Sequence, residues 1–275
     1  MAPTPILYSG GGKWHNRFMQ DEWCPLDEIS HPGGAGYCLL KLKSPALARQ
    51  SKPGQFVMVQ AGSGYDPLLR RPLGILKCDD SHFWLYFQIL GRGTSELASL
   101  KPGDRVRVLG PLGNGFSEYH RQRILLIAGG RGIVPLFFFA QRFAADNELF
   151  LIYGARRRQD LNLLEEIAAL PIQERILRSE DGSSGEKGMA TDGVTDLIDS
   201  RKITVTLSCG PEAMLKWLAE GLSVQPTENW VSLEAMMGCG FGICHSCVAE
   251  FIDGRYRKVC QDGPVFRLAE VRWST

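Results

Sequence analysis

The sequence lacks an excess of either charge, since 31 lysine and arginine residues are balanced by 30 aspartate and glutamate residues and the formal net charge is +1. Nucleic-acid-binding proteins usually carry a basic excess on one face, so we expect no nucleic-acid partner. Hydrophobic residues make up 44% of the 275 residues and charged residues 22%, as in ordinary globular proteins. A chain of this length can form about two domains with cores of their own.

The sequence also lacks an uninterrupted apolar run long enough for a membrane-spanning helix. Its most apolar segment, ILLIAGGRGIVPLFFFA at 124–140, contains Arg131 at its centre and Pro135. A central arginine costs about 2.5–3.5 kcal/mol in membrane insertion, so the segment is better explained as a buried strand, turn and helix. The first residues, MAPTPILYSGGGKWH, do not show the pattern of a signal peptide. We therefore expect a soluble, cytoplasmic protein without a membrane partner.

A disulfide framework is not expected, because no secretory signal is seen and four of the eight cysteines are widely dispersed. Cys24, Cys38 and Cys78 are interpreted as small, partly buried hydrophobic residues. The fourth dispersed cysteine, Cys209, ends an apolar run. The remaining four cysteines all lie between positions 239 and 260.

Hydrophobic patterning predicts a multidomain α+β protein. Residues 1–30 show no sustained periodicity and are interpreted as an N-terminal extension. Residues 31–120 contain short β-type runs such as QFVMVQ and HFWLYFQIL, separated by turn residues, which predicts an antiparallel β-barrel. Residues 121–225 alternate apolar runs with helical patterns, which predicts a doubly wound, Rossmann-like α/β domain. Residues 226–275 contain the cysteine group and are predicted to form a small third domain.

The clustered cysteines have the spacing C-x4-C-x2-C-x12-C. They are Cys239, Cys244, Cys247 and Cys260. The first three follow the plant-ferredoxin spacing for a [2Fe–2S] cluster, and the fourth follows a predicted hairpin that turns at Asp253 and Gly254. Structural zinc sites usually present two C-x2-C pairs, and a zinc site or free thiols stay open as alternatives.

Two glycine-rich turns in the first half suit the binding of phosphate groups. Arg71, in RRPLGI, can pair with a phosphate through two hydrogen bonds. The Gly93–Thr94 turn can offer backbone N–H groups and a hydroxyl to another phosphate. For either turn alone, a surface arginine or a plain hairpin turn is an equally good explanation.

Two further turns lie at predicted carboxyl ends of strands in the α/β domain. AGGRGIVPL (128–136) joins a strand to a helix, where a dinucleotide pyrophosphate often binds, although it is not a clean GxGxxG motif. CGPEAM (209–214) would place the thiol of Cys209 at the carboxyl edge of the sheet, facing the same crevice. The alternative for Cys209 is a small buried residue.

In this order, the motifs resemble those of the ferredoxin reductase-like flavoproteins. The motifs are RRPLG (70–74), GRGT (91–94), AGGRGIVPL (128–136), SCGPEAM (208–214), and SLEAMMGCGFGICHSC with VCQDGPVF (232–247 and 259–266). Most closely, the chain resembles the electron-transfer subunits of the NAD-linked dihydroorotate dehydrogenases, over about residues 25–275. DGPVF is the most distinctive part of this resemblance.

The resemblance implies three groups of site residues. The cluster ligands would be Cys239, Cys244, Cys247 and Cys260. The FAD-contacting residues would be Arg71, Pro72, Leu73, Gly74, Tyr86, Phe87, Gln88, Gly93 and Thr94. The residues of the nicotinamide-nucleotide site would be Gly129, Gly130, Gly132, Gly210 and Pro211, with Cys209 as a positioning residue beside the nicotinamide that does not act as a nucleophile.

Three features depart from the family pattern. Gly74 stands where the family usually has serine or threonine near the reactive flavin nitrogen. Gln88 stands where arginine is common, which leaves one fewer cation for the flavin phosphates. Ala128 and Arg131 alter the GGGIG-type turn of the nucleotide-binding half.

The nucleotide is expected to be NAD(H). Glu180 and Asp181 follow the strand-like run ERILR, where a carboxylate favours the free ribose hydroxyl over a 2′-phosphate. The three arginines of ARRRQ (155–159) are interpreted as a solvated loop.

The resemblance implies an oxidoreductase subunit that carries electrons between NAD(H), FAD and a [2Fe–2S] cluster. Its expected partner is an FMN-containing catalytic subunit that oxidises dihydroorotate to orotate in pyrimidine biosynthesis, in a heterotetramer. Alternatives are a reductase subunit of a hydrogenase or sulfur-reducing complex, a reductase of an oxygenase system, and a non-enzymatic zinc-binding module.

Overall fold

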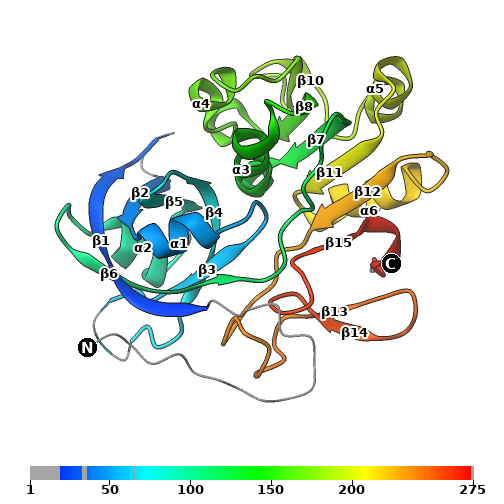
Figure 1. Ribbon diagram of the computed structural model, residues 1–275. Coiled ribbons are helices and arrows are strands. Elements are labelled where there is room, and N and C mark those ends of the chain that lie inside the picture. Colours follow the sequence, from blue (N-terminus) through cyan, green and yellow to red (C-terminus); the bar gives the residue numbers. More distant parts are fainter. Residues whose placement is uncertain (1–18, 33–35, 63, 65, 274–275) are drawn as a thin grey trace.

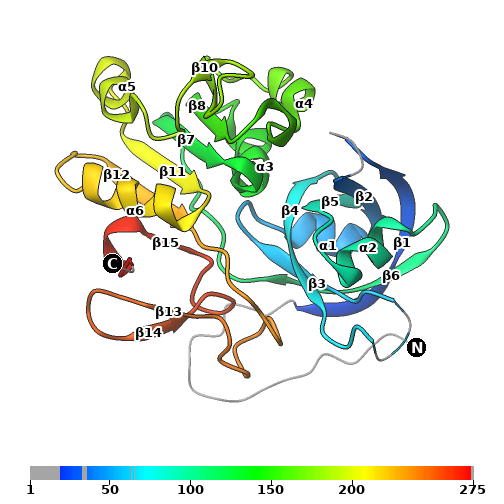
Figure 2. The ribbon, with the colours of Figure 1, turned by 180° about the vertical axis from the view of Figure 1, so that it is seen from behind.

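The structure is a computed structural model that describes residues 19–32, 36–62, 64 and 66–273. Figure 1 shows a β-barrel beside an open sheet with helices, and a C-terminal segment that folds against the edge of that sheet. The view from behind in Figure 2 shows the same arrangement. The predicted fold class, with a barrel, a Rossmann-like sheet and a small C-terminal part, is confirmed.

The barrel is closed, and its neighbouring strands are antiparallel. In spatial order its strands are β1 (Gln20–Ser30), β2 (Tyr37–Lys43), β5 (His82–Gln88), β4 (Arg71–Cys78), β3 (Phe56–Val59) and β6 (Arg105–Leu112). Two short helices, α1 (Pro45–Gln50) and α2 (Arg92–Ala98), lie in the connections. Phe83, Leu85 and Phe87 alternate along β5 and are buried in the barrel core, because successive side chains of a strand point to opposite faces.

The first barrel strand lies in the range that was interpreted as an N-terminal extension. Residues 20–30 pair with both β2 and β6, so this part of the interpretation is wrong. Only Cys24 and Leu26 of β1 are buried, and the hydrophobic alternation is therefore too sparse to recognise in the sequence. Residues 1–18 lie outside the described residues.

The second sheet has seven strands, and β7 and β11 lie side by side near its centre. In spatial order its strands are β10 (Glu186–Lys187), β9 (Glu174–Ser179), β8 (Glu148–Ala155), β7 (Arg123–Gly129), β11 (Val205–Cys209), β12 (Glu228–Ser232) and β15 (Val265–Arg267). Its helices are η1 (Gly130–Gly132), α3 (Ile133–Phe143), η2 (Arg158–Asp160), α4 (Leu164–Ala168), α5 (Val194–Arg201), α6 (Glu212–Gly221) and η3 (Leu268–Glu270). The chain leaves β7 toward β8 on one side and later returns to β11 on the other, which creates a crevice at the carboxyl ends of these strands.

The predicted boundary at residue 225 does not separate two domains in the structure. β12 continues the parallel sheet, and β15 pairs with it in antiparallel orientation. The sequence of β12, ENWVS, is mostly polar and only partly buried, so it does not show the apolar run of a central strand. Between β12 and β15 lie the cysteine loop and a hairpin of β13 (Val248–Glu250) and β14 (Tyr256–Lys258), which confirms the predicted hairpin.

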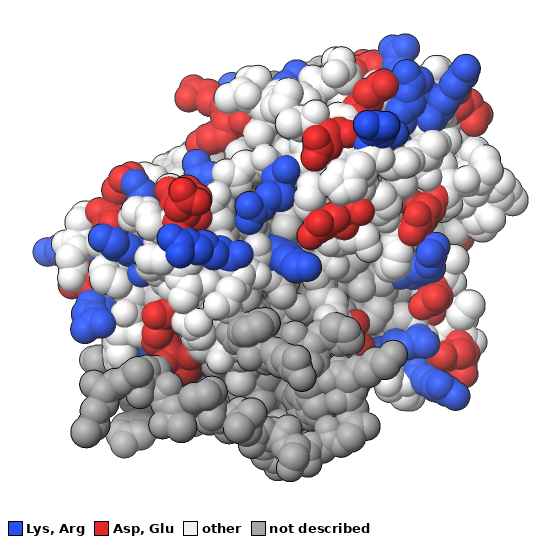
Figure 3. All heavy atoms as spheres, viewed as in Figure 1, with Lys and Arg blue, Asp and Glu red and all other residues white. Residues whose placement is uncertain are grey.

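Helix α3 joins the barrel to the α/β domain. The side chain of Phe138 is fully buried within the barrel core, and Val134 lies beside Gly74 of β4. Residues 124–140 therefore form a buried strand, turn and helix, as predicted. No helix within the described residues is long and apolar enough to cross a membrane. Figure 3 shows acidic and basic side chains interspersed over the described part of one face.

Candidate functional site

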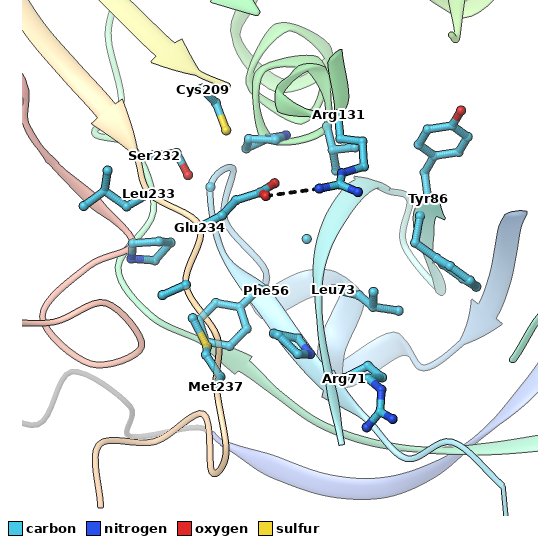
Figure 4. A pocket seen from close by; sticks show the side chains of 18 of the residues that line it. Phe56, Arg71, Leu73, Tyr86, Arg131, Cys209, Ser232, Leu233, Glu234 and Met237 are labelled. Atoms are coloured by element: carbon cyan, nitrogen blue, oxygen red, sulfur yellow. Dashed lines mark ion pairs between the residues drawn. The ribbon is translucent and has the colours of Figure 1, made fainter. Parts of the chain in front are cut away.

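A first cavity of about 290 Å³ lies between the barrel, the start of α3 and the segment that follows β12. Figure 4 shows this cavity from close by. Of the residues predicted to contact FAD, eight line it, namely Arg71, Pro72, Leu73, Gly74, Tyr86, Phe87, Gln88 and Thr94. The cavity is also lined by residues that were not predicted to contact FAD, including Phe56, Ser232, Glu234, Met237 and Pro264.

One end of the first cavity presents cationic and backbone donors. Arg71 begins β4 and donates a hydrogen bond to the carbonyl of Leu69. Gly93 does not line the cavity itself, but a Cβ atom there would lie 2.6 Å from Cζ of Arg71, so the missing side chain makes room for the guanidinium group. The first N–H groups of α2 have no partner within the helix, as at every helix start. This end suits a phosphate group.

The hydroxyl of Thr94 is used differently from the prediction. It accepts hydrogen bonds from the backbone N–H groups of Leu90 at 3.0 Å and Gly91 at 3.1 Å, and it donates to the carbonyl of Gly91 at 2.9 Å. A hydroxyl has one proton to donate and two lone pairs, so these three bonds use its full capacity. Thr94 therefore shapes the turn and occupies the N–H groups of Leu90 and Gly91, whereas the N–H groups of residues 92–94, at the start of α2, are left for a ligand.

Other parts of the wall of the first cavity are apolar. Phe56, Leu73 and Met237 contribute to this lining in Figure 4. A Cβ atom at Gly74 would lie 3.3 Å from Cγ1 of Val134, so the serine or threonine usual in the family would be a tight fit. Tyr86 stacks on Tyr37 with the ring centroids 5.5 Å apart, and burial raises the pKa of its hydroxyl, which has no hydrogen-bond partner among the described residues.

A second cavity of about 670 Å³ lies at the carboxyl ends of the central strands of the sheet. The predicted nucleotide-site residues Gly129, Gly130, Gly132, Gly210 and Pro211 all line it. A Cβ atom at Gly132 would overlap the backbone carbonyl of Cys209, so the two glycine turns pack directly against each other. They place η1 and the start of α3 beside the cavity, where helix N–H groups favour an anion.

Of the two residues predicted to select the nucleotide, only Glu180 lines the second cavity. Asp181 accepts hydrogen bonds from the backbone N–H and hydroxyl of Ser183 at 2.9 and 2.6 Å. These bonds hold the pKa of Asp181 below its usual value and commit its carboxylate to the turn. Arg156, interpreted from the sequence as part of a solvated loop, also lines the cavity.

Cys209 ends β11 and lines the first cavity and not the second. Its side chain is 2% exposed, and Figure 4 shows the sulfur directed into the cavity. Burial, with a smaller contribution from Glu234, raises the pKa of the thiol far above its ordinary value. The thiol is therefore neutral at pH 7, which suits a positioning residue and does not suit a nucleophile.

The four clustered cysteines form two neighbouring pairs. The backbone N–H of Cys239 donates to Sγ of Cys244 at 3.4 Å, and the N–H of Cys244 donates to Sγ of Cys239 at 3.5 Å. The N–H of Cys260 donates to Sγ of Cys247 at 3.5 Å. Hydrogen bonds from Ser246, and further bonds with Cys239, lower the pKa of the Cys244 thiol to about 6.

The burial of these pairs differs, because Cys247 and Cys260 are buried while Cys244 is exposed. Burial, followed by the neighbouring Cys247, raises the pKa of the Cys260 thiol. Within the described residues, no three cysteine, histidine or acidic side chains converge on one position as ligands of a single metal ion. Two pairs fit a cluster with two irons better than they fit one tetrahedral zinc ion.

The cysteine loop is fixed to the barrel and shares a wall with the first cavity. Gly240 has a φ of +83°, and a Cβ atom there would overlap Cγ of Met58 in β3. The side-chain amide of Asn114 donates to the carbonyls of Gln261 at 3.1 Å and Asp262 at 3.0 Å. Residues 237 and 264, which lie two and four positions from Cys239 and Cys260, line the first cavity.

Comparison with known proteins decides the family. The iron-sulfur cluster binding domain of dihydroorotate dehydrogenase B matches residues 234–272, and the oxidoreductase NAD-binding domain matches residues 126–220. A relative from Bacillus caldolyticus, named dihydroorotate dehydrogenase B (NAD(+)), electron transfer subunit, is 38% identical over 242 residues, which cover 84% of this chain and 91% of the relative. This chain belongs to the family of dihydroorotate dehydrogenase B electron transfer subunits.

Solved structures agree with this family fold. The structure of an NADH-dependent reduced ferredoxin-NADP oxidoreductase, from work on flavin-based electron bifurcation, is 28% identical, with a TM-score of 0.81, and covers 92% of this chain and 90% of that chain. A ferredoxin NADP+ reductase from Neisseria gonorrhoeae, solved with FAD and NADP, has a TM-score of 0.59 at 15% identity and covers 76% of this chain and 92% of that chain. The second likeness shows the shared fold alone.

The features that dihydroorotate dehydrogenase B electron transfer subunits need are present in this chain. The first cavity offers donors for phosphate, an apolar lining, and the hydroxyl of Tyr86, which is unpaired among the described residues, so its residues fit FAD. The two cysteine pairs fit a [2Fe–2S] cluster, and the second cavity fits a nicotinamide dinucleotide. Ser232 and Glu234 were not predicted to line the flavin cavity, and their only signal was their place at the start of the motif SLEAMMGCGFGICHSC, where β12 ends.

Proposed function

We propose that this chain is the electron transfer subunit of an NAD-linked dihydroorotate dehydrogenase. Its partner is a catalytic subunit that contains FMN and oxidises dihydroorotate to orotate, with NAD⁺ as the final electron acceptor, and the two kinds of subunit form a heterotetramer. Family membership and the names of the relatives support this function. They do not support an oxygenase reductase or a zinc-binding module.

One observation carries the proposal: the first cavity shares lining residues with the second cavity on one side and adjoins the cysteine loop on the other. Gln88, Arg131 and Glu234 line the first and the second cavity, and Met237 continues from the first cavity to Cys239. A nucleotide, a flavin and a cluster bound at these places would lie in a row. This arrangement suits a protein that passes electrons on and has no organic substrate of its own.

Bound FAD would exchange two electrons, as a hydride, with the nicotinamide and single electrons with the cluster. Arg71 and the backbone N–H groups of residues 92–94 would hold the FAD diphosphate. Phe56, Leu73 and Met237 would exclude water from the flavin. The neutral thiol of Cys209 lies in the flavin cavity and would add no charge where the nicotinamide approaches the flavin. Proton transfer by a side chain is not required.

The cysteine pairs would each hold one iron of the cluster. The buried pair, Cys247 and Cys260, would fix the cluster to the protein, and the exposed thiol of Cys244 would place the other iron near the surface, where a partner can approach. No disulfide joins any of the cysteines within the described residues, which supports a reducing compartment, and we place the protein in the cytoplasm.

Anaerobic purification followed by a visible spectrum and flavin and iron analysis tests this function. We expect a yellow-brown protein with one FAD and two irons per chain, which NADH reduces. Protein that contains neither flavin nor iron would refute the proposal. Co-purification from the native host identifies the partner. An FMN-containing subunit would support the proposal, whereas a hydrogenase or sulfur-reducing subunit would mean that the same cofactors serve another complex.

A further inference from the structure

Among the described residues, three line both cavities, and they come from three different parts of the chain. Gln88 ends β5 of the barrel, Arg131 lies in η1 of the α/β domain, and Glu234 follows β12 on the way to the cysteine loop. These side chains therefore form the partition between the proposed flavin site and the proposed nucleotide site.

Arg131 connects the other two members of the partition. Its Nη1 donates a hydrogen bond to Oε1 of Gln88 at 2.8 Å, and its Nη2 lies 3.7 Å from Oε2 of Glu234. The side chains of Arg131 and Glu234 are 39% and 64% exposed. Ion pairs of this length and exposure contribute little free energy, so the contact with Glu234 is easily exchanged for a better one.

The backbone of Arg131 is held in place while its side chain is free to turn. Gly132 packs so closely on the end of β11 that a Cβ atom would overlap the carbonyl of Cys209, and Gly130 has a φ of +51°. The guanidinium group sits at the end of a long side chain with several rotatable bonds, next to the glycine turn of the second cavity. It can therefore reach either Glu234 or a ligand in that cavity.

We propose that Arg131 is a nucleotide-positioning residue that exchanges Glu234 for the diphosphate of the nicotinamide dinucleotide. This inference rests on the proposed function, because it takes the second cavity to be the nucleotide site. In the unliganded protein, the Arg131–Glu234 pair closes the passage between the two cavities. When the dinucleotide binds, Arg131 turns to its diphosphate, and the passage to the flavin opens.

The chemistry of the groups supports this exchange. A guanidinium group forms paired, charge-assisted hydrogen bonds with phosphate oxygens, which are stronger than a long, exposed contact with a carboxylate. The hydrogen bond to Gln88 keeps the guanidinium group near the partition during the exchange.

Binding measurements on the flavin- and cluster-loaded protein test the proposal, with NADH and ADP-ribose as probes. Arg131→Gln should weaken both by about tenfold, which corresponds to about 1.4 kcal/mol, and should reduce the dependence of binding on salt. Arg131→Lys should restore part of the affinity. Arg142→Gln, which removes the same charge from the end of α3 and outside both cavities, is the matched control and should stay within about twofold of the wild type.

The direction in which Glu234→Gln changes the affinity for ADP-ribose is the decisive result. Because it removes the competitor for Arg131, it should tighten ADP-ribose binding by about two- to fivefold, and this gain should vanish in the Arg131→Gln background. Weaker or unchanged binding in Glu234→Gln, or unchanged binding in Arg131→Gln, overturns the proposal. If Arg131→Gln does not retain its flavin, the sign of Glu234→Gln alone decides. A wild-type protein that binds neither probe refutes the proposed function itself.

Discussion

Gly93 lies so close to Arg71 that a Cβ atom at position 93 would come within 2.6 Å of three atoms of the guanidinium group, namely Nε, Cζ and Nη2. The two residues belong to α2 and β4, and their contact fixes the guanidinium group against the turn that is proposed to bind the FAD diphosphate. Arg71 can keep this position only while residue 93 has no side chain.

Gly93→Ala should therefore weaken FAD binding by about 1.5–3 kcal/mol, the usual contribution of a hydrogen bond to a charged group. Alanine is the better helix former at this position within α2, so a loss of helix stability cannot cause the effect. The measurement is a fluorescence titration of flavin-free protein with FAD.

Gly91→Ala is the matched control, because a Cβ atom at Gly91 would meet nothing within 4 Å. It should bind FAD as the wild type does. Equal affinities of the Gly93→Ala and wild-type proteins would show that Arg71 does not hold the diphosphate from this position.

Cys244→Ala should remove the visible absorption of the cluster and all electron transfer to the partner, while FAD stays bound and reducible by NADH. The reason is that the thiol of Cys244 contacts Cys239 and Ser246 within the loop and lies apart from the residues that line the first cavity. Absorbance spectra before and after addition of NADH separate the two cofactors. Cys78→Ala, which removes a thiol from the barrel core, should retain both signals. Electron transfer to the partner in the Cys244→Ala protein would contradict the relay.

The sequence was sufficient for features that depend on nearby residues. The cysteine spacing, the glycine turns and the alternation of strands and helices each follow from local chemistry, and the structure contains the predicted barrel and sheet. β1 and β12 were missed because partly exposed strands need few apolar side chains. Their positions are set by pairing with strands that are distant in the sequence.

The candidate site depends on contacts that no local pattern contains. Gln88 and Arg131 are 43 positions apart and were noted separately as departures, yet they form a hydrogen bond. The hydroxyl of Thr94 was expected to face a phosphate, but its own turn uses its full capacity. Ser232 and Glu234 gained a role only because β12 ends beside the first cavity.

Cys209 should resist alkylation in the native protein from pH 7 to pH 9. Alkylation requires the thiolate, and burial raises the pKa of this thiol, so the folded protein keeps it protonated above the pH at which an ordinary thiol titrates. Cys24 and Cys38, with pKa values raised to about 12, should behave in the same way. In the unfolded chain all three should react, at a rate that rises steeply near pH 8.5. Mass spectrometry after iodoacetamide treatment gives the modified positions, and rapid native labelling of Cys209 would exclude a buried, neutral positioning role.

Gly240→Ala should disturb the attachment of the cysteine loop to the barrel more than its backbone strain alone explains. Gly240 and Gly254 both have positive φ values, +83° and +76°, so alanine costs about 1–2 kcal/mol of backbone strain at either position. At Gly254 a Cβ atom would meet nothing within 4 Å, whereas at Gly240 it would overlap Met58 and lie 3.2 Å from Leu112 in the barrel. The overlap should cost a further 1–3 kcal/mol, roughly the usual penalty of overpacking.

Thermal unfolding and cluster content of the Gly240→Ala and Gly254→Ala proteins provide the comparison. Because the loop joins the cluster to the flavin cavity, Gly240→Ala should also slow NADH-dependent reduction of the cluster, while Gly254→Ala should not. Equal behaviour of the two variants would mean that the loop does not depend on this contact with the barrel.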